Sequence, residues 1–229
     1  MNAPVQSAPL VVFDLDGTLI DTAADLVASL NHTIGVEGLA PVGFDDLTYL
    51  VGHGVQVMIR RAFSLRGREL SDGDLERMLS TFVEHYAAGM PGQSVLYPGL
   101  ADAMERLSAA GYRLAVCTNK MEMLAKRLLE GLGVTYRFAA ITGGDTFAVR
   151  KPDAEHLLGT IRLAGGDPVR TVMIGDSLND MLVAKNAGIP SIGVPFGYSD
   201  VPVESLEPTH VITHFNELHS ELVERLLAR

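Results

Sequence analysis

Residues 10–21 read LVVFDLDGTLID. The first four residues form an apolar run that ends directly in acidic residues and a glycine, which is typical of a buried parallel strand that opens into a loop. Residues two apart in an extended chain point the same way, so the carboxylates of Asp14 and Asp16 can enter one cleft. The two carboxylates would repel each other, and a hard divalent cation such as Mg²⁺ would relieve this repulsion. Taken alone, the stretch could also be a turn that uses two aspartates.

The same pattern of an apolar run followed by polar residues recurs along the chain. The further runs are Arg113–Cys117, Phe138–Ile141, Thr171–Ile174, Ser191–Val194 and His210–Thr213. Helical patterns separate them, including an apolar face over 100–107 that Gly111 ends and an apolar stripe over 215–226. Strands that alternate with helices predict an α/β fold with a doubly wound, Rossmann-like parallel sheet. In such sheets the chemistry lies at the carboxyl ends of the strands.

Residues 21–94 interrupt this alternation. The segment contains no convincing strand, whereas residues 55–65 and 75–86 follow helical spacing. The sequence therefore predicts two parts, an α/β core made of residues 1–20 and 95–229 and an inserted helical subdomain made of residues 21–94.

Two more groups of polar residues follow predicted strands, and a lysine lies further along the chain. Asp176 and Asp180 come after one of them, and Thr118 and Asn119 come after another. Each pair could simply cap a helix. Beside the first two carboxylates, however, Asp176 and Asp180 are better explained as metal ligands, and Thr118 and Asn119 offer groups suited to phosphate oxygens. Lys151 would supply a cation for the same phosphate, although a lone lysine is usually just solvated.

Composition limits the class of protein. The formal net charge is −10 and no basic stripe is visible, which argues against a nucleic-acid partner. No apolar stretch approaches the roughly 18 residues that a membrane span requires. Residues 1–9 do not have the pattern of a signal peptide. Cys117 is the single cysteine, so no internal disulfide can form and a cytoplasmic location is expected.

Together these clusters resemble the four motifs of the haloacid dehalogenase-like superfamily, in order and each after a strand, from Val11 to about Val211. The superfamily's phosphatases and phosphomutases carry the second aspartate, here Asp16, whereas its haloalkanoate dehalogenases lack it. The resemblance thus implies a Mg²⁺-dependent phosphatase. Asp14 would be the nucleophile that forms an aspartyl-phosphate, and Asp16 would be the acid and base.

The resemblance also implies the remaining roles. Mg²⁺ would bind the carboxylate of Asp14, the backbone carbonyl of Asp16 and the carboxylate of Asp176, with Asp180 in the metal site or next to it. The residues that hold the phosphoryl oxygens would be Thr118, Asn119 and Lys151. The helical insertion would be a cap that closes over the site, with hinges near Ile20–Asp21 and Gly92–Val95.

Four shorter stretches resemble bacterial phosphoglycolate phosphatases. They are Gly52–Val55, Val116–Lys120, Gly143–Thr146 and Arg150–Asp153. The implied reaction converts 2-phosphoglycolate to glycolate and phosphate, so the cap must accept a small carboxylate. Candidate contacts are His53, Arg60 and Lys120, although Arg60 could lie on a solvated helix face and His53 at the tip of a loop.

Alternatives remain open at this point. One is a phosphatase of another small metabolite, such as a sugar or amino-sugar phosphate, and another is a phosphomutase of the same superfamily. A non-catalytic binding module that kept the fold is the third. The expected partner is a small anionic phosphomonoester, and the expected assembly is a monomer or homodimer.

Overall fold

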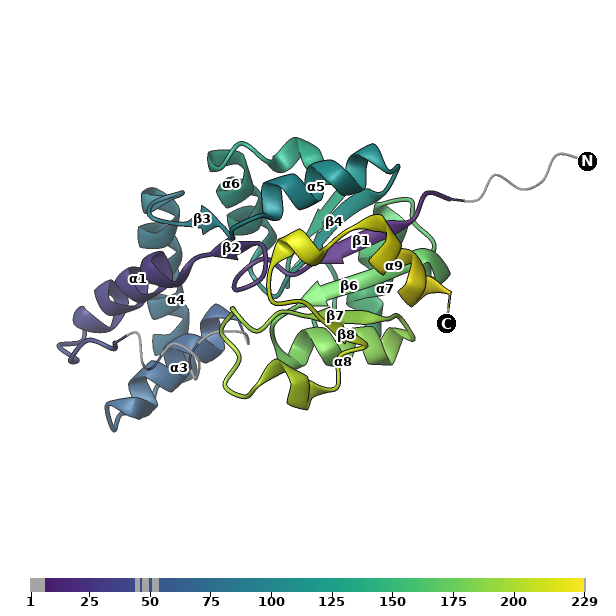
Figure 1. The fold of residues 1–229 in the computed structure, drawn as a ribbon. Helices are drawn as coiled ribbons and strands as arrows, with labels where there is room; N and C mark the ends of the chain where they lie inside the picture. Colours follow the sequence, from purple (N-terminus) through teal and green to yellow (C-terminus); the bar gives the residue numbers. More distant parts are fainter. Residues whose placement is uncertain (1–6, 44–45, 47–49, 51–53, 229) are drawn as a thin grey trace, which may run out of the picture.

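The computed structural model describes residues 7–43, 46, 50 and 54–228. Its centre is a six-stranded sheet in the order β5-β4-β1-β6-β7-β8, in which all neighbouring strands are parallel (Figure 1). The strands are β1 (Leu10–Phe13), β4 (Arg113–Cys117), β5 (Ala140–Thr142), β6 (Thr171–Gly175), β7 (Ser191–Gly193) and β8 (His210–Val211).

Helices cover both faces of this sheet. One face carries α5 (Leu100–Ala109), α6 (Glu122–Gly131) and α9 (Ser220–Leu227), and the other carries α7 (Ala154–Leu163) and α8 (Leu178–Ala187). Strand β1 shows why both faces must be covered. Val11 and Phe13 belong to the first apolar cluster, whereas Leu10 and Val12 belong to the second. The predicted doubly wound α/β fold is confirmed.

A second group of helices lies beside the carboxyl ends of the strands (Figure 1). We call it the helical unit, and it consists of α1 (Ala23–Gly35), α3 (Val55–Leu65) and α4 (Asp72–Gly89). It has its own apolar cluster, in which Ile59, Phe63 and Phe82 are buried. Leu124 of α6 also belongs to this cluster, so the helical unit packs against the core.

A short antiparallel ribbon joins the two parts. Strand β2 (Ile20–Asp21) pairs with β3 (Val95–Leu96), with Ile20 opposite Leu96 and Asp21 opposite Val95. The chain leaves the core through β2 and returns through β3. Neither strand was predicted, because two residues are too few to show a period.

The predicted bounds were wrong at two places. The apolar stripe over 215–226 is not one helix, because a 3-10 turn at Phe215–Glu217 ends before α9 begins. The side chains of His214 and His219 accept hydrogen bonds from the backbone N–H of Asn216 and Leu222, respectively. His214 is therefore the N-cap of the 3-10 turn, and His219 is the N-cap of α9. The strand predicted over 138–141 lies instead at Ala140–Thr142, after a 3-10 turn. Further 3-10 turns are Thr135–Arg137, Pro168–Arg170 and Val203–Leu206.

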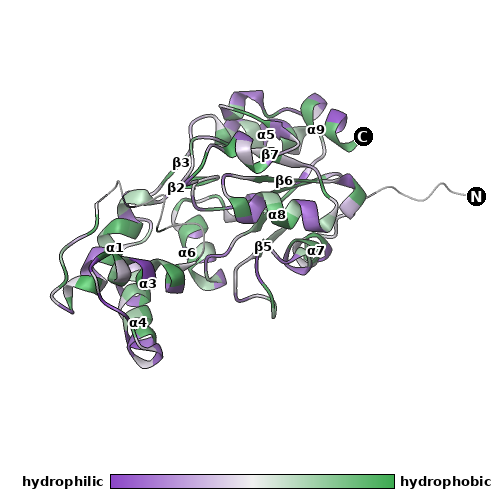
Figure 2. Cartoon of the chain, turned by 90° about the horizontal axis from the view of Figure 1, so that it is seen from below, coloured by the Kyte–Doolittle hydropathy of each residue, from purple (hydrophilic) through white to green (hydrophobic). Residues whose placement is uncertain are grey.

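The helices around the sheet are two-faced. In Figure 2, α5, α7 and α8 each carry both green and purple, as expected for helices with one side on a sheet and one side in water. None of the helices in the described part of the chain is both long and apolar enough to span a membrane.

The core of the helical unit provides a stability test. Phe63 is completely buried, so we expect Phe63→Ala to lower the free energy of unfolding by about 3–5 kcal/mol through lost transfer energy and a residual cavity. The neighbouring Ser64 is exposed, and we expect Ser64→Ala to change it by no more than about 0.5 kcal/mol. Denaturant unfolding of both variants checks this. A Phe63→Ala loss as small as that of Ser64→Ala would contradict the described packing.

Candidate active site

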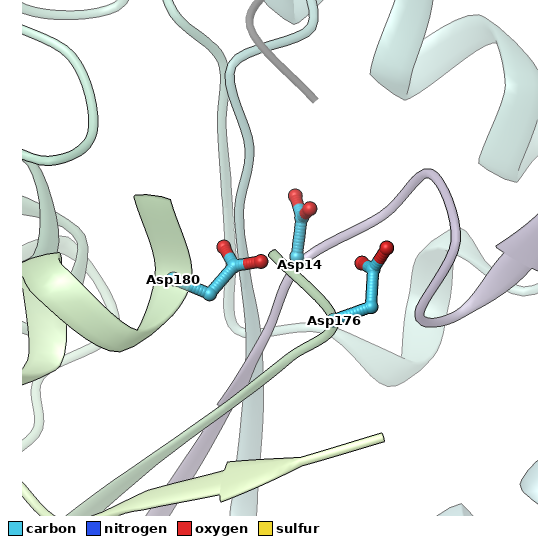
Figure 3. Close-up of side chains that lie close together, drawn as sticks. All are labelled: Asp14, Asp176 and Asp180. Carbon is cyan, nitrogen blue, oxygen red and sulfur yellow. The ribbon is translucent and has the colours of Figure 1, made fainter. Parts of the chain in front are cut away.

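The polar residues that follow the strands meet at the carboxyl edge of the sheet. Asp14 follows β1 and Asp176 follows β6, while Asp180 lies in the first turn of α8. Figure 3 shows the three carboxylates approaching one another from these elements. One oxygen from each lies within 4.8 Å of the others, and all three residues are buried.

Lys151 balances part of this negative charge. Its ammonium lies 2.7 Å from Asp14 Oδ1 and 2.6 Å from Asp180 Oδ1, and it is buried too. Burial alone would lower the pKa of Lys151, but Asp14 and Asp180 outweigh burial and raise the pKa. Lys151 is therefore a fixed positive charge between two carboxylates.

One ammonium does not offset three carboxylates. Burial, followed by repulsion from Asp180, raises the pKa of Asp14 to about 6 although Lys151 opposes the shift. Burial and the repulsion of Asp180 and Asp14 raise the pKa of Asp176 to about 8. A divalent cation with oxygen ligands would offset the repulsion that adds to these shifts. The carboxylates of Asp14, Asp176 and Asp180 therefore fit such an ion.

Further contacts fix the carboxylates of Asp176 and Asp180. Thr18 Oγ1 donates to Asp176 Oδ1 at 2.8 Å, and the backbone N–H of Tyr198 donates to Oδ2 at 2.7 Å. Ser177 donates to Asp180 Oδ2 from both its backbone N–H and its hydroxyl. Gly17 has φ = 82°, and a Cβ there would lie 2.5 Å from Asp176 Oδ2, so only glycine fits beside this carboxylate.

His156 contacts the backbone of Lys151. The backbone N–H of Lys151 donates to His156 Nδ1 at 3.0 Å, and the ring is completely buried. Burial, followed by the charge of Lys151, lowers the pKa of His156 to about 4, so the ring is neutral at pH 7. A neutral ring can accept the Lys151 N–H, and His156 therefore helps to fix the loop that carries the lysine.

Thr118 and Asn119 follow β4 and line the same edge. The backbone N–H of Thr118 donates to the carbonyl of Thr142, and Asn119 Nδ2 donates to the carbonyl of Lys151. Asn119 Oδ1 is buried and has no hydrogen-bond partner among the described residues. Such an atom usually marks a place where a ligand or water completes the bonding.

Asp16 is held from two directions. Thr22 Oγ1 donates to Asp16 Oδ1 at 2.8 Å, and Lys120 Nζ lies 2.9 Å from Oδ1 and 3.1 Å from Oδ2. Lys120 also donates to the hydroxyl of Tyr86, on α4, at 2.9 Å and lies over the ring of Tyr86. Burial raises the pKa of Tyr86 to about 12, so its hydroxyl stays protonated. Lys120 thus links Asp16 to the helical unit.

A cavity opens between the helical unit and the core. Its core wall includes Asp14, Asp16, Thr118, Asn119 and Lys120. The opposite wall is mostly apolar and comes from the helical unit, with Leu26, Val55, Met58, Phe82 and Tyr86. The carboxylates of Asp14 and Asp16 therefore lie in a sheltered space between the two walls.

The structure brings together most of the residues that the sequence singled out, but not all of them. Arg60 points away from the cavity, because its guanidinium pairs with the Asp72 carboxylate and the Leu70 carbonyl and remains partly exposed. His53 lies outside the described residues. The sequence reasoning did not assign Thr18, Tyr86, His156 or Tyr198 to the site. The partners of Thr18, Tyr86 and Tyr198 are distant in the chain and carry no local signal, whereas His156 contacts Lys151 five residues away.

The chain was compared with known proteins. The model of the family described as "haloacid dehalogenase-like hydrolase" matches residues 11–194. A phosphoglycolate phosphatase from Agrobacterium fabrum is 60% identical, with 97% of this chain and 95% of that protein covered. One from Mesorhizobium japonicum is 52% identical, with 96% and 97% covered.

A solved structure shares the fold. The crystal structure of a predicted phosphoglycolate phosphatase from Haemophilus somnus superimposes with a TM-score of 0.86 and is 27% identical. The superposition covers 93% of this chain and 97% of that chain. The family resemblance seen in the sequence is confirmed.

The buried carboxylates predict how stability depends on pH. The pKa values of Asp14 and Asp176 are raised in the folded chain, so the folded state holds more protons than the unfolded state between about pH 4 and pH 8. The protonated carboxyls stabilise the folded state fully at pH values below the pKa that they have in the unfolded chain. This stabilisation is lost as the pH rises through about 6 for Asp14 and about 8 for Asp176. With a chelator present, we therefore expect the melting temperature to fall from pH 5 to pH 8.

Added Mg²⁺ should raise the melting temperature more at pH 8 than at pH 5, because protons compete with the ion for the carboxylates. With Asp176→Asn, the melting temperature should fall less between pH 5 and pH 8. Asp102, on α5, is exposed, and Asp102→Asn should leave this fall unchanged. Thermal unfolding over this pH range measures all three. Equal effects of Mg²⁺ at both pH values would contradict the assignment of the carboxylates to a metal site.

Proposed function

This chain belongs to the haloacid dehalogenase-like hydrolases, and from that membership we propose that it is a magnesium-dependent phosphatase that converts 2-phosphoglycolate to glycolate and phosphate. The observation that carries the proposal is the environment of Asp14. Its buried carboxylate lies at the floor of the cavity, 2.7 Å from Lys151 and beside Asp176 and Asp180. The choice of substrate is supported by the relatives named phosphoglycolate phosphatase.

In this proposal Asp14 is the nucleophile. One of its carboxylate oxygens bonds to phosphorus as the bond from phosphorus to the glycolate oxygen breaks, which leaves an aspartyl-phosphate. Lys151 holds the Asp14 carboxylate through the 2.7 Å ion pair and provides positive charge beside the transferring group. Thr118 and Asn119, at the same edge, are suited to bind phosphoryl oxygens.

Asp16 is the acid and base in the two halves of the reaction. It gives a proton to the departing glycolate oxygen, and it then takes a proton from the water that attacks the aspartyl-phosphate. We assign Lys120 the task of holding the Asp16 carboxylate, which it contacts through both oxygens. Lys120 is therefore a positioning residue in this proposal and not the residue that binds the substrate carboxylate.

Mg²⁺, held by Asp14, Asp176 and the backbone carbonyl of Asp16 with Asp180 close by, would supply the charge that lets a carboxylate approach an anionic phosphate. We further propose that residues 21–94 act as a cap. The apolar side chains of the helical unit that face the cavity exclude water from the reacting groups. The β2–β3 ribbon would be the hinge of this cap.

The test is phosphate release from 2-phosphoglycolate, measured with and without Mg²⁺ against a panel of sugar phosphates and phosphoserine. We expect a Mg²⁺-dependent preference for 2-phosphoglycolate. Asp14→Asn should lower kcat by roughly 10⁴-fold or more, because it removes the nucleophile, whereas Asp102→Asn should not change it. A preference for another phosphate would reject the substrate, and full activity of Asp14→Asn would reject the mechanism.

The role of Asp16 can be separated from that of Asp14 with p-nitrophenyl phosphate, whose leaving group needs no proton. With Asp16→Asn the first step should remain fast, and the hydrolysis of the aspartyl-phosphate should slow by about 10²- to 10⁴-fold. Rapid mixing should then show a burst of p-nitrophenolate close to the enzyme concentration, followed by slow turnover. Slow turnover without a burst would show that Asp16 acts before the intermediate or only through the fold.

A further inference from the structure

A second hollow adjoins the catalytic cavity, and we call it the arginine recess. It lies between α3 and the core, with Val57 and Arg61 on one side and Asn119, Arg150 and Asn179 on the other. Asn119 lines both the recess and the cavity, so the two spaces share a wall.

The recess is positively charged within a chain whose formal net charge is −10. Its ionisable lining residues are Arg61, Arg150 and Lys151, and no acidic residue is among the described residues that line it. Lys151 is already paired with Asp14 and Asp180. Arg150 therefore provides charge that an incoming anion would meet at this recess.

Arg150 lies close to the start of α3. It is exposed, and no carboxylate of the described residues forms an ion pair with it. A Cβ built on Gly54, just before α3, would lie 3.6 Å from Arg150 Nη1, so the guanidinium lies near the backbone at the beginning of this helix. A guanidinium is well suited to a carboxylate because it can donate two parallel hydrogen bonds.

Lys120, the lysine that lines the catalytic cavity, is a poorer partner for a substrate carboxylate. Its ammonium contacts both oxygens of Asp16 and the hydroxyl of Tyr86, which together occupy its donors. A substrate carboxylate could bind there only by displacing Asp16, the proposed acid and base, or the hydroxyl of Tyr86. The competition favours the arginine recess.

We propose that the arginine recess binds the second acidic group of the substrate, with Arg150 as the contact. This inference rests on the proposed function, in which that group is the carboxylate of 2-phosphoglycolate. Arg150 is then a residue that determines specificity. It selects phosphomonoesters that carry an acid next to the phosphate-bearing carbon over those that carry a hydroxyl there.

The experiment compares 2-phosphoglycolate with 2-hydroxyethyl phosphate, in which a hydroxymethyl group replaces the carboxylate. The measured quantity is the ratio of kcat/KM for the two substrates. The wild type should favour 2-phosphoglycolate, and Arg150→Gln should lower the ratio by about tenfold to a hundredfold, as expected for a lost hydrogen bond to a charged group. Arg150→Lys keeps the positive charge but loses the two parallel N–H donors of the guanidinium. It should therefore lower the ratio less than Arg150→Gln does.

Arg225→Gln is the matched control, because Arg225 is exposed on α9 and does not line the recess. It should leave the ratio unchanged. If Arg150→Gln lowers kcat/KM equally for both substrates, or for neither, the ratio stays constant and the inference is overturned while the proposed function stands. If the wild type shows no preference between the substrates, the proposed substrate itself fails, and the recess has no carboxylate to recognise.

Discussion

The rest of the structure depends on the charge balance around Lys151. Three buried carboxylates lie together, and a single buried ammonium pairs with two of them, so the cluster of Asp14, Asp176 and Asp180 carries excess negative charge whenever all three are ionised. Excess charge in a buried place is costly, and proteins relieve it by protonation, by pairing or by binding a metal ion. Here pairing uses Lys151, yet burial and mutual repulsion still raise the pKa values of Asp14 and Asp176. A divalent cation would complete the balance with the ligands that it prefers.

The second layer of residues makes this arrangement rigid. Thr18 and the backbone of Tyr198 fix Asp176, while Ser177 fixes Asp180. The hydroxyl of Tyr198 also contacts Asp21 at 2.7 Å, and the backbone N–H of Thr22 donates to it. One tyrosine therefore touches both a proposed metal ligand and the ribbon that leads to the helical unit. Any movement of the helical unit at this ribbon must rearrange contacts next to Asp176.

Much of this could be predicted from the sequence because the signals are local. Asp14 follows an apolar run directly, and parallel strands bring such positions to one edge of the sheet. The contact between Thr18 and Asp176 spans 158 residues and has no signature in either segment. The sequence also did not show which side of α3 faces the core. The sequence pointed to Arg60, yet the next residue, Arg61, lines the recess, because helical neighbours differ in direction by about 100°.

The division of labour follows from which part of the molecule supplies each group. The carboxylates stand on strand ends and on the start of α8, where the parallel sheet fixes their positions, and Lys151 lies in the loop between β5 and α7. The helical unit contributes apolar walls, Tyr86 against Lys120, and Arg61 opposite Arg150. Since neither part encloses the cavity or the recess alone, a substrate is surrounded only when the two parts are together. The catalytic groups are fixed on the sheet, whereas the residues that contact the rest of the substrate come from both parts. Substitutions in the helical unit can therefore alter which substrate binds without disturbing the charge balance at the sheet edge.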